Sequence, residues 1–187
     1  MHGRSCPNEK QSFVDYDNGE FAKIAIEKLV KKNRKHILMI TPPQNQSYGL
    51  EMVQSAKNTA EKHNISLIIA PIITSDSSIT LISDTVSKQI INNKKIDGIL
   101  VGTPKGAMAA VAGFEKLNLS IGQDIDIVAK DAVNFLKLFR NQIIVINENV
   151  EIAGKKLAEA AIHAAQNPDS EPIQYIDRPE SNYTKFN

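Results

Sequence analysis

IDGILVGTPKGAMAAVAGFEKLNLSIGQDIDIV, residues 96–128, contains three segments with different patterns. Residues 97–101 are mostly aliphatic and β-branched, which is typical of a short buried strand. Residues 107–117 are rich in small side chains and predict a helix that packs closely on a sheet. Residues 125–128 are strand-like again. A strand, a helix and another strand in this order form the repeating unit of a parallel sheet.

The same alternation continues on both sides of this stretch. Further strands are predicted at residues 13–14, 36–40, 67–70, 143–146 and 173–176, and further helices at 21–30, 48–63, 78–92 and 150–165. Such regular alternation predicts an α/β fold, a doubly wound parallel sheet with helices on both faces.

Composition excludes several classes of protein. Lys and Arg (22) nearly balance Asp and Glu (21) over 187 residues, so the chain lacks the basic excess of a domain that grips nucleic acid. No apolar run approaches the roughly 18 residues of a membrane span, and residues 1–7 do not resemble a secretory signal. The single cysteine, Cys6, excludes an internal disulfide. These features favour a cytoplasmic protein.

Motifs of common enzymes are missing from the sequence. The nine glycines have no phosphate-loop spacing, and no Gly-x-Ser-x-Gly elbow is present. The four histidines are far apart in sequence and show no metal-ligand spacing. We therefore predict neither catalysis, nor a cofactor, nor a metal site.

Three passages, in order, resemble the regulatory domain of the lac repressor family, whose fold is that of type I periplasmic binding proteins. They are residues 14–22 with 34–37, residues 96–101 with 118–128, and residues 146–157 with Gly154 in a returning helix. The second passage is the most specific, and the resemblance covers residues 13–178.

The resemblance implies a domain organisation. Residues 1–12 are a disordered leader, 13–178 the effector-binding domain and 179–187 a polar tail. Within the domain, residues 19–140 correspond mainly to the second subdomain, and 141–168 return to the first. The DNA-binding head and most of the first subdomain are expected to lie outside this chain. An apolar face of the returning helix is then expected to need a partner.

The family also implies where an effector binds, near the carboxyl ends of the strands. Asn18 lies at the turn where the family often has a ligand-facing Asp or Asn, although a helix N-cap explains it equally. Asp131 matches the effector-binding Asp of the family, with loop capping as the alternative.

Four more candidates come from the same resemblance. Thr103 replaces a common Asn, Tyr48 is placed to stack on a sugar, and Glu51 stands near a position where many relatives have Arg. Glu148 lies before the returning helix, where it closes the site or only caps that helix.

These residues predict the sugar-binding regulatory domain of a transcriptional repressor that lacks its DNA-binding head. The resemblance also implies a homodimer, DNA contact only through the missing head, and no membrane contact. One alternative is the solute-binding protein of a sugar transporter, which predicts an export signal. Another is a flavodoxin-like enzyme or signalling domain, which predicts a phosphate loop or an acidic cluster.

Overall fold

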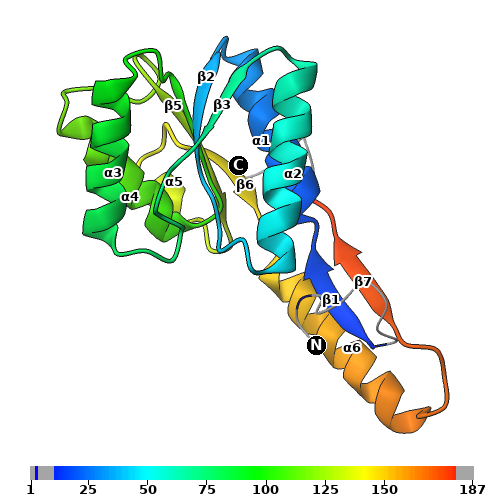
Figure 1. Ribbon diagram of the computed structural model, residues 1–187. Coiled ribbons are helices and arrows are strands. Elements are labelled where there is room, and N and C mark those ends of the chain that lie inside the picture. Colours follow the sequence, from blue (N-terminus) through cyan, green and yellow to red (C-terminus); the bar gives the residue numbers. More distant parts are fainter. Residues whose placement is uncertain (1–2, 4–10, 180–187) are drawn as a thin grey trace.

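Two parallel sheets make up the framework of the computed structural model, which describes residue 3 and residues 11–179 (Figure 1). The larger sheet has five strands in the order β3-β2-β4-β5-β6, and the smaller pairs β1 with β7. The strands are β1 (Phe13–Tyr16), β2 (His36–Ile40), β3 (Ser66–Ile69), β4 (Gly98–Val101), β5 (Asp126–Asp131), β6 (Ile144–Asn147) and β7 (Gln174–Asp177). The predicted fold class is confirmed.

Helices cover both faces of the larger sheet because its strands carry apolar side chains on both sides. Along β2, Leu38 and Ile40 belong to one buried cluster, whereas Ile37 and Met39 belong to the other. The helices are α1 (Asn18–Lys31), α2 (Ser47–Lys62), α3 (Ile79–Asn92), α4 (Pro104–Glu115), α5 (Phe135–Phe139) and α6 (Val150–Gln166). α1 and α2 cover one face, and α3 and α4 the other (Figure 1). The short α5 is absent from the sequence-based prediction.

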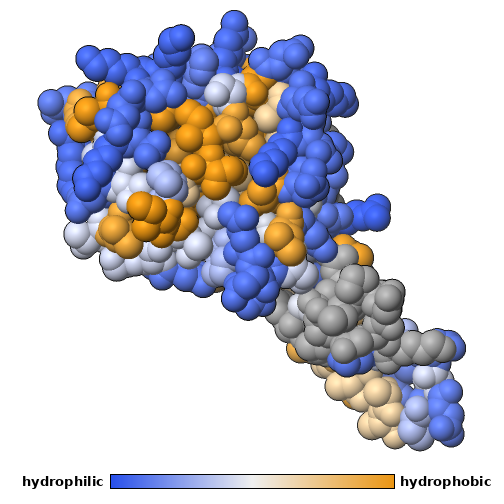
Figure 2. All heavy atoms as spheres, in the orientation of Figure 1, coloured by the Kyte–Doolittle hydropathy of each residue, from blue (hydrophilic) through white to orange (hydrophobic). Residues whose placement is uncertain are grey.

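The strand β3 forms one edge of the larger sheet. Its residues 67–69 are only partly buried, between helices that cover the two faces. Figure 2 shows apolar atoms gathered at the centre of this side of the molecule, flanked by the polar outer surfaces of the helices.

An arm extends from the larger sheet and consists of β1, β7 and α6 (Figure 1). Ala153 and Ala160 are the buried residues of α6, which packs on β1. The chain passes from the arm to the larger sheet at Asp17 and returns after Asn147. The larger sheet thus runs to residue 147, past the expected subdomain end at 140.

The outer side of α6 is exposed along much of its length. Val150 is half exposed and Ala161 is exposed, whereas Leu157 is partly buried. Nearly all of the expected leader and tail lies outside the described residues.

The amino ends of the central strands are closed by buried charge. Arg34 Nε lies 2.7 Å from Asp126 Oδ2, and the side chain of Asp126 is almost fully buried. The Asp97 carboxylate accepts hydrogen bonds from the backbone N–H groups of Lys35 and His36. The carboxylates of Asp97 and Asp126 are thus satisfied by partners within the chain itself.

Helices α3 and α4 approach each other closely at Gly113. A Cβ atom there would lie 2.6 Å from the Ser83 carbonyl oxygen and 3.0 Å from the Val86 Cβ. The Ser87 hydroxyl also donates a 2.6 Å hydrogen bond to the Gly113 carbonyl. Gly113 therefore serves close packing of α4 on the neighbouring helix α3, whereas the sequence predicts close packing of this helix on the sheet.

We expect Gly113→Ala to lower the free energy of unfolding by about 1–2 kcal/mol, because overpacking outweighs the gain in helix propensity. Gly154→Ala is the matched control, since a Cβ in α6 would meet no heavy atom within 4 Å. That substitution is expected to raise stability by roughly 0.5–1 kcal/mol. Urea denaturation of both variants measures the difference, and equal stabilisation would contradict the close packing of α3 on α4.

Candidate ligand-binding site

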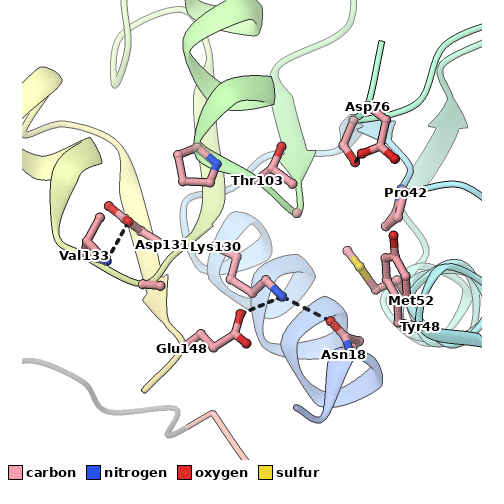
Figure 3. Close-up of a pocket in the computed structure, with 14 residues that line it drawn as sticks. Asn18, Pro42, Tyr48, Met52, Asp76, Thr103, Lys130, Asp131, Val133 and Glu148 are labelled. Atoms are coloured by element: carbon pink, nitrogen blue, oxygen red, sulfur yellow. Dashed lines mark hydrogen bonds and ion pairs between the residues drawn. The ribbon is translucent and has the colours of Figure 1, made fainter. Parts of the chain in front are cut away.

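A cavity of about 250 Å³ opens at the carboxyl edge of the larger sheet, beside the two chain crossings to the arm. Residues from the ends of β2, β4 and β5 line it, together with residues from α1 and α2 (Figure 3). The lining comprises Asn18, Pro42, Tyr48, Met52, Ser75, Asp76, Gly102, Thr103, Pro104, Lys130, Asp131, Ala132, Val133 and Glu148.

Asp131 ends β5 and holds the loop that follows. Its Oδ1 accepts a 3.0 Å hydrogen bond from the Val133 N–H, and its Oδ2 accepts a 2.7 Å bond from the Leu136 N–H. The residue is 1% exposed. Asp131 thus performs the loop-capping role, and it is also one of the residues that line the cavity.

Lys130, one residue earlier, connects several elements at the floor of the cavity. Its Nζ lies 2.9 Å from Glu148 Oε2 and donates a 3.4 Å hydrogen bond to Asn18 Oδ1 (Figure 3). It also stands 4.7 Å from the centroid of the Tyr16 ring, within range of a cation–π interaction. The end of β5 is thereby tied to both crossings between the sheet and the arm.

Tyr16 reinforces the same junction from β1. Its hydroxyl donates a 3.3 Å hydrogen bond to the Asn147 carbonyl oxygen. Burial raises the pKa of Tyr16 well above its usual range, and the negative charge of Glu148 raises it further. The phenol is therefore protonated at neutral pH and acts as the donor.

The opposite wall of the cavity is mainly apolar. Tyr48 and Met52 are one helical turn apart on α2, and Pro42 lies beside them (Figure 3). Asp76 faces Tyr48 across this wall: burial raises the pKa of Tyr48, and the charge of Asp76 contributes to the same rise. A ligand in the cavity would meet an aromatic ring with a carboxylate next to it.

Five of the six residues predicted from the sequence line this cavity: Asn18, Tyr48, Thr103, Asp131 and Glu148. Glu51 does not. It lines a separate groove between α1 and α2 with Gly19 and Ser55. The reason is helical geometry, since adjacent residues on a helix point about 100° apart and Met52 takes the direction of the cavity.

The capping alternatives are also decided by the structure. Asp17, not Asn18, caps α1 by accepting from the Glu20 N–H. Asn149, not Glu148, caps α6. Thr103 caps α4 with its hydroxyl and lines the cavity as well.

Lys130 and Asp76 are missing from the sequence-based prediction. The sequence does contain an indication that Lys130 is partly buried, because strand alternation places it on the same face of β5 as the buried Val128. A lysine at such a position needs a partner. Asp76 lies in an irregular loop whose placement no periodicity reveals. Within the described residues, no group of three potential ligands could hold a metal ion.

A family model described as a periplasmic binding protein-like domain matches residues 26–183, most of the chain. The chain belongs to this family. Membership agrees with the parallel strands and with the cavity at the carboxyl edge of the larger sheet. No helix in the described part of this family member is long and apolar enough to cross a membrane.

Relatives of this periplasmic binding protein-like chain are transcriptional regulators. The HTH-type transcriptional regulator CelR of Thermobifida fusca is 18% identical over 174 residues, which are 91% of this chain and 50% of CelR. The chain therefore spans about half the length of the curated relative that it matches.

Solved structures show the same fold. The CelR–cellobiose complex has a TM-score of 0.82 at 18% identity, covering 96% of this chain and 55% of the other. A LacI-family regulatory protein from Chloroflexus aggregans has a TM-score of 0.83 at 16% identity (96% and 64%). The Escherichia coli trehalose repressor has a TM-score of 0.78 at 17% identity (94% and 65%). The resemblance to the lac repressor family is confirmed.

Asp131→Asn is expected to lower the free energy of unfolding of this periplasmic binding protein-like domain by about 1–3 kcal/mol, because an amide cannot accept from both buried N–H groups through two oxygens. Asp76→Asn, at an exposed position of the same cavity, is the control and should change stability by less than about 0.5 kcal/mol. Chemical denaturation monitored by circular dichroism measures both. Equal losses would contradict the loop-holding role of Asp131.

Proposed function

We propose that this chain is the effector-binding domain of a transcriptional repressor and that its cavity binds a sugar. The observation that carries this proposal is the convergence of Asn18, Asp131 and Glu148 with an aromatic wall, at the carboxyl edge of a parallel sheet. Ligands of open α/β sheets bind at this edge. The names of two similar proteins, a CelR–cellobiose complex and a trehalose repressor, support the sugar as ligand.

The lining suits the chemistry of a sugar. Carboxylates of Asp131 and Glu148 accept hydrogen bonds from hydroxyl groups, and the Asn18 amide offers both donor and acceptor atoms. Tyr48 and Met52 provide an apolar surface for the C–H face of a sugar ring. Thr103 adds a hydroxyl at the start of α4.

The position of the cavity suggests how binding would be transmitted. Asn18 and Glu148 stand at the two crossings between sheet and arm, so a ligand bonded to them favours one arrangement of the arm. In a repressor, that preference would change how a DNA-binding head is held, which is a coupling between two sites. We assign DNA contact to such a head and none to these residues, and we assign no catalysis to the cavity.

The proposal includes a cytoplasmic location and a homodimer. Leu138 on α5 is 87% exposed, with Phe135 and Val133 also exposed nearby, and such apolar side chains favour a contact with another chain.

Light scattering after size exclusion should give twice the mass of the chain. Leu138→Ser is expected to shift the equilibrium to the monomer, whereas an unchanged dimer would place the contact elsewhere.

A solute-binding protein of a sugar transporter is the alternative function with the same cavity. The coding sequence upstream of Met1 distinguishes the two. A helix-turn-helix in the same frame supports the repressor, whereas an export signal supports the transporter.

Isothermal titration calorimetry with a panel of neutral mono- and disaccharides tests the site. We expect at least one sugar to bind, and Tyr48→Ala to weaken it about tenfold or more because the stacking ring is lost. Tyr48→Phe keeps the ring and is the matched control, with most of the affinity retained. If the whole panel fails to bind, or if Tyr48→Ala binds as tightly as the parent, the assignment of this cavity is wrong.

A further inference from the structure

The charges around the cavity are unequal. Three carboxylates line it, those of Asp76, Asp131 and Glu148, whereas Lys130 is the single cationic side chain among the fourteen lining residues. Lys130 is already paired with Glu148 at 2.9 Å, and only about a fifth of its side chain is exposed. Its charge is thus engaged by the protein itself, and the lining as a whole is negative.

Three of the helices that begin near the cavity have N-termini capped by side chains of the protein, whereas α2, which contributes Tyr48 and Met52 to the lining, has no side-chain cap. Such termini bind phosphate and carboxylate groups through unpaired backbone N–H groups. Here α1 is capped by Asp17 (2.8 Å to the Glu20 N–H), α4 by Thr103 (3.2 Å to the Gly106 N–H) and α6 by Asn149. In α1, α4 and α6, side chains of the protein therefore occupy N–H groups on which an anion would otherwise depend.

In the loop after β5, backbone N–H groups are likewise already bonded to a side chain of the protein. Its Val133 and Leu136 N–H groups point at one carboxylate, Asp131, at 3.0 and 2.7 Å. Backbone N–H groups that converge in this way can form an anion site in other proteins. In this chain a buried aspartate already occupies these N–H groups beside the cavity.

We propose that the cavity selects uncharged sugars and rejects sugars that carry a phosphate or carboxylate group. This inference rests on the proposed function, since it assumes that the cavity binds a sugar. Hydroxyl groups donate to the three carboxylates, whereas an anionic group offers mainly acceptors and brings like charge. Lys105, outside the lining, donates to the Asp76 backbone carbonyl oxygen and not to its carboxylate.

The test compares matched ligands by calorimetry at low ionic strength. The probes are glucose, ribose and fructose, each beside its phosphate monoester, and glucuronate beside glucose. For any pair with measurable binding, we expect the neutral member to bind about tenfold or more tightly than the anion.

Glu148→Gln isolates the origin of this preference. Glutamine can still accept a hydrogen bond from Lys130 but releases its positive charge, so the preference for the neutral member should shrink by about tenfold. The control is Asp84→Asn, which removes the partner of Lys116 in an exposed ion pair away from the cavity lining. It changes the net charge equally and should leave the preference unaltered.

The possible outcomes distinguish a failure of this inference from a failure of the proposed function. A phosphate or uronate that binds the parent protein more tightly than its neutral counterpart overturns the inference and leaves sugar binding intact. An equal response to Glu148→Gln and Asp84→Asn also overturns it, because net charge rather than the cavity would then set the preference. Failure of every probe to bind contradicts the proposed function, and the inference falls with it.

Discussion

Parallel pairing of the five central strands is the constraint from which the rest of the structure follows. Because all strands run the same way, their amino ends share one edge and their carboxyl ends share the other. The amino edge is closed by the ion pair between the partly buried Arg34 and the buried Asp126. At the carboxyl edge each strand leads into a loop, a helix or a crossing to the arm, so the polar side chains that cap those turns gather around one hollow. The position of the cavity therefore follows from the strand topology, and no single residue determines it.

The sequence predicted the large elements well because their patterns are local. The apolar run at residues 36–40 and the small residues of α4 signal a strand and a helix without knowledge of their neighbours. By contrast, α5 has five residues, too few to show a helical period. The pairing of β6 with β5 depends on strand order in space, which the chain does not reveal locally. The extent of the larger sheet could therefore be learned only from the structure.

In the candidate site, too, the sequence predicts some residues and does not predict others. Asn18, Thr103 and Asp131 follow strands or start helices, and position in the topology is enough to bring such residues together. The position of Glu51 outside the cavity depends on how α2 is rotated about its own axis. The sequence of a single helix does not give that rotation. The sequence does not predict Lys130 as a site residue because a lysine at the end of a strand is ordinarily solvated, whereas here three groups from other parts of the chain surround it. The sequence alone does not reveal which residues distant along the chain become the contact partners of Lys130.

The two crossings between sheet and arm have a mechanical consequence. They lie next to each other, joined by the hydrogen bond from the Tyr16 hydroxyl to the Asn147 carbonyl, and the Asp17 N–H donates to the Asp177 carbonyl beside them. Two bodies connected through neighbouring strands of covalent chain can rotate readily about the line that joins the attachments, but they resist twisting across it. Within residues 11–179 the arm has these two connections to the larger sheet, an arrangement that favours rotation about the line between them over other motions. Small displacements at Asn18 or Glu148, close to that axis, correspond to much larger displacements at the far end of α6.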